Sequence, residues 1–368
     1  MTRKEEKAEA GNTSAGTRAG LTKRRFLTAA GTAAAATAAS SFPAPYVKAQ
    51  KQIRWRLQTY AGAALAEHVI KPSIEAFNKA ANGEMVIDLY TADQLVPHGE
   101  LFRAVQAGTI DAAQSDDDSI AAPVDVAVFG AYFPLASRYS LDVPTLWHWY
   151  GLKEIWEEAY AEVENVTWLS TGAWDPCNFA TTKPIRSLKD FEGLRLYMFP
   201  TVGRFMQRFG VIPISLPYED VELAIQTGEL DGVAWSGITE DYTVGWADVT
   251  KYYLTNPVSG AWAGSYFVNT ERWNELPEHL KTLFQLCIDS SHYYRLHWYW
   301  WGEANYRVYG GKLELTSIPQ EEWRTVEEEA RKFWDEIAAQ SDRNRRVVEI
   351  LKKYLATMEK AGPPYRYG

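Results

Sequence analysis

Two segments of the chain resemble one another at a distance of 120 residues. Residues 104–112 read AVQAGTIDA and residues 224–232 read AIQTGELDG. In each copy a predicted helix ends at glycine and a predicted strand carrying aspartate follows; a helix, a strand and an acidic loop come before. A chance match is the alternative, but the repeat favours two similar α/β lobes. Ligands bind at the carboxyl ends of parallel strands, so two facing lobes would form a cleft.

The first 50 residues have the organisation of an export signal. A basic run at residues 22–25 precedes a weakly apolar, alanine-rich stretch from Thr28 to Ser41. Small residues follow, with a plausible cleavage position after Ala49. The basic motif is similar to a twin-arginine signal, although the twin position reads Lys23-Arg24. An ordinary secretory signal is the alternative, and either one predicts a soluble mature protein in the periplasm.

Hydrophobic periodicity predicts alternating strands and helices in the first part of the mature chain. We expect strands at 53–60 and 85–89, helices at 67–80 and 100–108, and a further strand from Thr109. The last hundred residues differ, because they predict long helices at 274–309, 320–341 and 344–361. We therefore divide the chain into 1–50 as signal and linker, 51–171 as lobe 1, 172–257 as lobe 2, and 258–368 as helices, with part of 258–310 returning to lobe 1.

The chain lacks the common sequence motifs of catalysis. We find no P-loop, no dinucleotide-binding glycine motif, no GxSxG and no HExxH, and the 6 histidines are not spaced as metal ligands. The net charge of −9 argues against a nucleic-acid partner. The two cysteines, Cys177 and Cys287, are expected to be buried thiols, although a disulfide would be possible if the fold brought them together. We expect a binding protein, not an enzyme.

Two local clusters have both a functional and a structural interpretation. Asp116-Asp117-Asp118 follows a predicted strand, where it could face a cleft and hold a cation, a metal ion or a polyol; the alternative is a solvated loop that caps the next helix. The aromatic run Trp298-Tyr299-Trp300-Trp301 lies on a predicted helix, and we expect it to serve core or inter-helix packing.

Several segments, in this order, resemble the solute receptors of TRAP transporters (the DctP family), and the closest branch is the one for 2-oxo acids and lactate. The segments are 54–60 (RWRLQTY), 105–112 (VQAGTIDA), 190–195 (DFEGLR), 228–235 (GELDGVAW) and 251–253 (KYY). The resemblance implies an α/β fold with two lobes, a long helix spanning both, and extra C-terminal helices. It also implies delivery of the solute to a membrane permease. The family includes dimers joined through C-terminal helices, so a homodimer stays open here.

Three positions depart from that branch. Tyr197 stands where the family has an arginine that grips a carboxylate, and a tyrosine supplies no charge. The Glu-Trp pair that helps to hold a metal ion reads Ala234-Trp235, and the upstream glutamine position reads Trp174. Without these oxygen ligands we expect no metal and no cofactor. The expected substrate-binding residues form an aromatic cleft with acidic neighbours: Tyr60, Asp117, Trp174, Asp175, Tyr197, Trp235 and Trp262.

Two kinds of solute are compatible with these expected binding residues. A small carboxylate is expected from the resemblance, while the altered residues favour a cationic, zwitterionic or aromatic solute, because aromatic faces beside a carboxylate attract cations. An exported enzyme of unknown chemistry is the remaining alternative.

Overall fold

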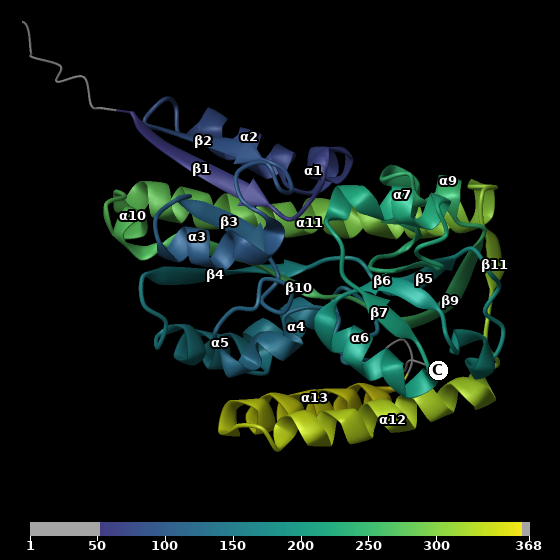
Figure 1. Cartoon of the computed structure of the whole chain (residues 1–368). Helices are drawn as coiled ribbons and strands as arrows, with labels where there is room; N and C mark the ends of the chain where they lie inside the picture. Colours follow the sequence, from purple (N-terminus) through teal and green to yellow (C-terminus); the bar gives the residue numbers. More distant parts are fainter. Residues whose placement is uncertain (1–51, 363–368) are drawn as a thin grey trace, which may run out of the picture. The chain divides into compact units, whose positions relative to one another are not determined.

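The computed structural model describes residues 52–362, so the predicted signal at residues 1–50 lies outside the described part. Two sheets form the framework, with strand orders β2-β1-β3-β10-β4 and β11-β9-β5-β8-β6-β7 (Figure 1). We call the first sheet and its helices lobe 1, and the second sheet and its helices lobe 2. The strands are β1 (Ile53–Thr59), β2 (Met85–Tyr90), β3 (Ala112–Ser115), β4 (Val166–Ala173), β5 (Cys177–Thr181), β6 (Arg195–Met198), β7 (Ile212–Ile214), β8 (Gly232–Ala234), β9 (Tyr252–Ser259), β10 (Ala263–Asn269) and β11 (Glu314–Thr316).

Helices cover the sheets, as expected for an α/β fold with two lobes. The α-helices are α1 (Ala63–Val69), α2 (Lys71–Ala80), α3 (Leu101–Gln106), α4 (Asp142–Trp149), α5 (Leu152–Tyr160), α6 (Pro200–Met206), α7 (Val221–Gln226), α8 (Ile238–Thr243), α9 (Trp246–Val249), α10 (Thr270–Asn274), α11 (Glu278–Tyr309), α12 (Gln320–Ala338) and α13 (Asp342–Ala361). Short 3₁₀ helices include η1 (His98–Glu100), η2 (Asp125–Phe129), η4 (Gln207–Phe209) and η5 (Tyr218–Asp220).

The sequence repeat corresponds to a repeat in topology. In lobe 1, β1 lies between β2 and β3 and is parallel to both; in lobe 2, β6 lies between β7 and β8 and is parallel to both. Each third strand follows a short helix, α3 or α7, and a glycine with positive φ: Gly108 at +71° and Gly228 at +76°. The prediction of two similar α/β units is therefore confirmed.

The repeated aspartate has the same role in both units. The carboxylate of Asp111 accepts a hydrogen bond from the Arg56 N–H at 2.7 Å, and that of Asp231 accepts one from the Arg195 N–H at 3.0 Å. Each donor belongs to the central strand of its unit, β1 or β6. The aspartate thus satisfies a backbone donor of the neighbouring strand, and it aligns the two strands.

The predicted helix at 67–80 is wrong in one respect, because two helices, α1 and α2, meet at Ile70. Pro72 stands in the first turn of α2, where its missing N–H costs nothing. Within a continuous helix, the same proline ring would clash with the carbonyl of residue 68 and remove one hydrogen bond. The chain therefore ends one helix and begins another.

The chain passes between the sheets at two neighbouring crossover segments. Residues 174–176 join β4 of lobe 1 to β5 of lobe 2, and residues 260–262 join β9 back to β10. A backbone hydrogen bond of 3.0 Å from the Trp174 N–H to the Trp262 carbonyl connects the two segments.

The long helix α11 contacts both lobes, packing on α1, α2 and β4 of lobe 1 and on α8 of lobe 2 (Figure 1). The sequence predicted one or two long helices beginning near Pro277, and the structure has one, α11. Of the aromatic run on this helix, Tyr299 is buried, but Trp300 and Trp301 are 67% and 54% exposed. Packing within this chain therefore explains only part of that run.

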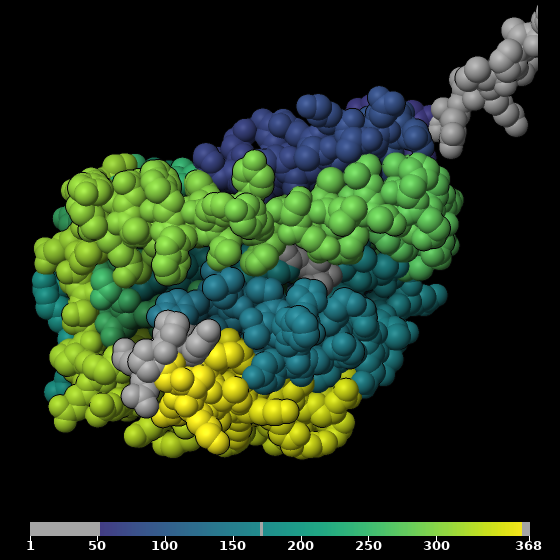
Figure 2. Space-filling view, turned by 180° about the vertical axis from the view of Figure 1, so that it is seen from behind, coloured from purple at the N-terminus to yellow at the C-terminus, as the bar shows by residue number. Residues whose placement is uncertain are grey.

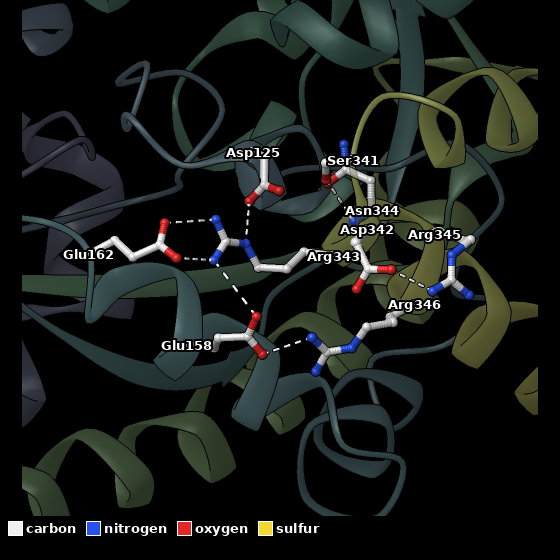
Figure 3. A network of polar contacts seen from close by, with 9 residues as sticks. All are labelled: Asp125, Glu158, Glu162, Ser341, Asp342, Arg343, Asn344, Arg345 and Arg346. Carbon is white, nitrogen blue, oxygen red and sulfur yellow. Dashed lines mark hydrogen bonds and ion pairs between the residues drawn. The ribbon is translucent and has the colours of Figure 1, made fainter.

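The C-terminal helices α12 and α13 also contact both lobes. Arg208 of η4, in lobe 2, forms ion pairs with Glu329 and Glu336 of α12. On the lobe 1 side, Arg343 of α13 binds Asp125 at 2.8 Å and both carboxylate oxygens of Glu162 at 2.7 and 2.9 Å (Figure 3). These ion pairs thus hold the C-terminal helices α12 and α13 against both lobes.

Among residues 52–362, no helix is long and apolar enough to span a membrane. Both cysteines are free thiols: Cys177 is buried as predicted, whereas Cys287 on α11 is only partly buried.

Replacing Arg343 with glutamine should lower the free energy of unfolding by about 1–2 kcal/mol, because it removes a bidentate, partly buried ion pair between α13 and lobe 1. The matched control is Arg345→Gln, because Arg345 is 51% exposed and pairs with Asp342 and Glu349 of its own helix. That change should cost measurably less, because both ion pairs of Arg345 are exposed and lie within one helix. Denaturant unfolding followed by circular dichroism measures both, and equal losses would contradict the role given to Arg343.

Candidate functional site

Two tryptophans stack where the chain crosses between the lobes. The rings of Trp174 and Trp262 have centroids 4.9 Å apart and planes inclined by 24°. Tyr60, at the carboxyl end of β1, contacts both rings edge-on at 5.5 Å. Three residues predicted for the site, from three distant parts of the sequence, therefore meet at the crossovers.

Lobe 2 contributes a second aromatic group at the ends of its central strands. Trp235, directly after β8, lies between Phe199 at 3.7 Å and Tyr197 at 4.4 Å, and both pairs are stacked. Tyr132 contacts Phe199 at 5.2 Å and Trp262 at 6.1 Å, so the two groups are continuous. We call these seven side chains the aromatic cluster: Tyr60, Tyr132, Trp174, Tyr197, Phe199, Trp235 and Trp262.

Two buried carboxyl groups adjoin the aromatic cluster. One oxygen of Asp175 accepts a hydrogen bond from the Tyr132 hydroxyl at 2.6 Å, and the other accepts the Gly237 N–H at 2.7 Å. Glu240 on α8 accepts a hydrogen bond from the Tyr299 hydroxyl of α11 at 2.6 Å. Both residues are 1% exposed. Burial raises the pKa of Asp175 to about 7 and raises the pKa of Glu240 well above its ordinary value.

A third carboxyl group lies beside them. Asp241 is also 1% exposed, and neither of its oxygens has a hydrogen-bond partner within residues 52–362. Burial raises the pKa of Asp241, and the nearby Glu303 and Asp175 raise it further. A buried carboxyl group without a bonded cation favours its neutral form.

Two arginines of α11 lie near these acids. Arg295 is 1% exposed; its guanidinium carbon lies 4.2 Å above the ring of Trp174, and it donates to the Ser291 hydroxyl at 2.6 Å. Burial lowers the pKa of Arg295. Arg307 forms an ion pair of 3.0 Å with Glu303. The site thus combines aromatic faces, carboxyl groups and one deeply buried guanidinium.

The predicted site residue Asp117 lies apart from the aromatic cluster. Its carboxylate accepts hydrogen bonds from the hydroxyls of Tyr160 and Ser265, inside lobe 1. Burial raises the pKa of Asp117 to about 6. The buried carboxylate of Asp117 therefore has its hydrogen-bond partners inside lobe 1.

The other two aspartates of the run have different contacts. Asp116 accepts the Ser119 N–H at 2.7 Å within a turn, and it is 1% exposed, so it is neither solvated nor a helix cap as the alternative interpretation expected. Asp118 accepts hydrogen bonds of 2.8 Å from both the N–H and the hydroxyl of Thr201, at the start of α6 in lobe 2. Asp118 therefore joins the two lobes.

A glycine marks a second close contact between the lobes. A Cβ atom on Gly62, before α1, would lie 2.6 Å from a carboxylate oxygen of Glu219 and 2.8 Å from a ring carbon of Tyr218. Only glycine allows α1 to approach η5 so closely. Together with the burial of the aromatic cluster, these contacts describe a closed arrangement of the lobes.

Sequence reasoning missed several residues around the site. Tyr218 of η5 was recoverable, because it lies 120 positions after His98, which opens the equivalent turn of lobe 1. Glu240 and Tyr132 gave no such signal. Arg295 could not be found, because nothing in a long helix indicates which residue faces a site made by distant loops. Within residues 52–362, no group of three or more His, Cys, Asp or Glu side chains could hold a metal ion.

Comparison with known proteins agrees with this architecture. Residues 67–341 match the model of the DctP family, described as bacterial extracellular solute-binding protein, family 7. A TRAP periplasmic solute-binding protein from Chromohalobacter salexigens, solved with bound (S)-(+)-2-amino-1-propanol, is 67% identical with a TM-score of 0.85, over 86% of this chain and 100% of that one.

More distant relatives differ in the solutes that they are named for. The monocarboxylate 2-oxoacid-binding periplasmic protein of Nostoc is 25% identical over 82% of this chain and 84% of its own length. A TRAP protein from Pseudoalteromonas atlantica, solved with sodium and pyruvate, shares the fold at 16% identity and a TM-score of 0.74, over 84% of this chain and 96% of that one.

The matched family consists of transport receptors and is not a family of enzymes. Together with the two α/β lobes and the aromatic cluster between them, the match means that this chain belongs to the DctP family and is a periplasmic solute receptor of the TRAP type.

Proposed function

We propose that this receptor captures a small protonated amine that also carries a hydroxyl group, and delivers it to a TRAP permease. The observation that carries the proposal is the pair of buried carboxyl groups, Asp175 and Glu240, set against the aromatic cluster. A buried ammonium ion needs a carboxylate partner, and aromatic faces add cation–π attraction of about 1–2 kcal/mol in a desolvated site.

Polar atoms near these carboxyl groups fit the hydroxyl of such a solute. The Tyr218 hydroxyl and the indole N–H of Trp174 are buried, and neither has a hydrogen-bond partner within the described residues. Tyr218 lies near Glu240 and Asp175, since both carboxyl groups raise the pKa of its hydroxyl after burial does. Buried donors of this kind are normally satisfied in a functional complex.

The relative from Chromohalobacter salexigens supports this class of solute, because 2-amino-1-propanol has an ammonium group and a hydroxyl group on a small apolar frame. We accordingly assign the solute contacts to Tyr60, Trp174, Asp175, Tyr197, Trp235 and Trp262 from the sequence-based list, and we add Glu240 and Tyr218. Asp117 is left out of this assignment, because its hydrogen bonds lie within lobe 1.

A small carboxylate is the second candidate, and a specific residue favours it. Arg295 is buried above Trp174 and lies near Tyr60, where its guanidinium could bind a carboxylate in place of the arginine that Tyr197 replaces. The carboxylates named for the more distant relatives agree with this candidate.

Solute binding between lobes favours the closed state by the difference in affinity between the closed and open states. We propose that the crossovers at 174–176 and 260–262 are the hinge and thus divide the lobes, close to the boundaries predicted from sequence. The permease would then recognise the closed conformation of the receptor. We also propose export by the twin-arginine route, from the motif around Lys23-Arg24.

The exposed face of α11 supports a homodimer. Large apolar residues form two rows at seven-residue spacing along α11. Figure 2 shows this helix as a green band above the yellow α13. We call these apolar residues the α11 rows, and each is more than half exposed: Leu286, Tyr293 and Trp300; Tyr294, Trp301 and Val308.

The α11 rows suit pairing with a second copy, because they are symmetric about His297. An antiparallel copy of α11 related by a two-fold axis at this residue places Leu286 opposite Val308, Tyr293 opposite Trp301, and Tyr294 opposite Trp300. If half of the roughly 200 Å² surface of each of these side chains is buried on pairing, the interface covers on the order of 600 Å² per copy. This area is near the roughly 800 Å² per partner of a stable interface.

Titration calorimetry with 2-amino-1-propanol, ethanolamine, pyruvate and lactate tests the solute class. The two amino alcohols should bind, and Glu240→Gln should weaken their binding by about 100-fold, because a charged hydrogen bond is worth roughly 1.5–3 kcal/mol. Asp117→Asn, a buried carboxyl group outside the cluster, should change affinity by less than about threefold. Binding of carboxylates alone would reject the amine and support the second candidate.

Asp118→Asn should lower solute affinity about tenfold, because the amide can accept only one of the two hydrogen bonds that Thr201 donates across the lobes. Thr201→Val should have a similar effect. The double variant should lose little more than either single one, since both remove one interlobe contact. Additive losses would mean that Asp118 and Thr201 act separately.

Trp300→Glu should convert the dimer into a monomer, as measured by sedimentation velocity at micromolar concentration. Trp149→Glu is the control, because Trp149 is 84% exposed but lies on α4 and is not a member of the α11 rows. A monomeric wild-type protein would reject the dimer.

A further inference from the structure

Four carboxyl groups from three elements meet behind the aromatic cluster: Asp175 from a crossover, Glu240 and Asp241 from α8, and Glu303 from α11. We call them the carboxyl cluster. Gly237, which precedes α8, joins them. Its N–H donates to Asp175 at 2.7 Å, and a Cβ atom on it would lie 2.2 Å from a carboxylate oxygen of Glu303. Glu303 also accepts the Thr239 N–H at 3.3 Å.

The positive charges around the carboxyl cluster balance only part of its negative charge. Arg307 pairs with Glu303 at 3.0 Å. Arg295 lies over the ring of Trp174 and donates to Ser291. Arg138 lines the same cavity as Asp175 and Glu303, and it forms an ion pair of 3.6 Å with Glu327 of α12. Other polar neighbours are neutral at pH 7, and they come from several elements: Tyr60, Tyr132, Tyr218, Tyr253 and Tyr299, with the thiol of Cys177. The other three carboxyl groups of the cluster, Asp175, Glu240 and Asp241, thus share a buried region that contains little compensating positive charge.

We propose that the receptor releases about one proton from the carboxyl cluster when it captures a protonated amine. The inference rests on the proposed function, because it needs a cationic solute. A neutral carboxyl group loses its proton to solvent, and the resulting carboxylate pairs with the ammonium group of the solute. No covalent bond to the solute forms or breaks, and the net charge of the site stays the same.

Burial makes this exchange favourable. Ionising Asp175, Glu240 and Asp241 together would leave several negative charges unpaired in a desolvated site, so the free receptor retains protons there. A bound ammonium ion reverses this balance for the carboxyl group that it faces. The raised pKa of Asp175, about 7, and the raised pKa values of Glu240 and Asp241 agree with proton retention near neutral pH.

A cavity borders two members of the carboxyl cluster. A space of about 330 Å³ is bounded by Trp174, Asp175 and Glu303 together with Trp300 of α11. Asp175 itself is 1% exposed. A proton that leaves Asp175 can pass into this space, on the α11 side, while the solute occupies the aromatic side.

The test is titration calorimetry of the wild-type protein with (S)-2-amino-1-propanol at pH 6.5, in two buffers with very different enthalpies of ionisation. The binding enthalpies in the two buffers should differ by roughly 0.5–1 times the difference between the ionisation enthalpies of the buffers, because about that many protons are released per solute. The affinity should rise about tenfold from pH 6 to pH 8, as expected for one group with a pKa of about 7. The amine stays protonated in this range, because alkylammonium groups titrate near pH 10.

Asp241→Asn distinguishes proton exchange from a merely structural effect. Removing one neighbouring carboxyl group should ease ionisation of Asp175, so the rise in affinity should move to lower pH while affinity at pH 8 stays within about threefold. Asp117→Asn should leave the pH profile unchanged, because that carboxyl group faces the interior of lobe 1.

The possible results separate the two claims. Binding with equal heats in both buffers and no change in affinity from pH 6 to pH 8 would overturn the proton exchange and leave the proposed amine receptor intact. No binding of the amine at any pH would reject the proposed function itself.

Discussion

The stacked pair of Trp174 and Trp262 is the contact on which the arrangement of this receptor depends. The chain crosses between the sheets at these residues, and one backbone hydrogen bond joins them. Flat stacked rings can slide or tilt with little loss of contact, so they suit the hinge that we propose at these crossovers. The same rings also contact Tyr60, so movement there would change the aromatic cluster directly.

The electrostatics of the site follow from this position. The crossover places Asp175 beside α8 and α11, where Tyr132 and Gly237 hold its carboxyl group away from solvent. Holding a carboxyl group this deeply costs stability unless a cation pairs with it, which is the physical basis of the cationic solute that we propose. Arg295 also borders the site, because its guanidinium lies over the ring of Trp174 and near the hydroxyl of Tyr60.

Much of the fold was predictable from sequence, because the repeat and the helix periodicity are local signals. The paired helix–strand units and the long α11 required only these patterns. The aromatic cluster was largely predictable as well, since Tyr60 and Trp235 follow strands, Trp174 and Trp262 lie in crossovers, and Tyr197 lies near the end of β6. Glu240 and Arg295 were not, because their place in the site depends on how helices pack on distant loops. The split at Ile70 was missed because the effect of Pro72 was overlooked.

The aspartate run shows why adjacent residues of one chemical type need not share a role. The run begins directly after β3 and enters a turn, where successive side chains point in different directions, so Asp116, Asp117 and Asp118 meet a turn, a core and the opposite lobe. Only Asp118 can respond to closure, since its partner Thr201 belongs to lobe 2. Sequence can predict that three carboxyl groups lie near a cleft, but only the packing around the strand determines which one holds the lobes together.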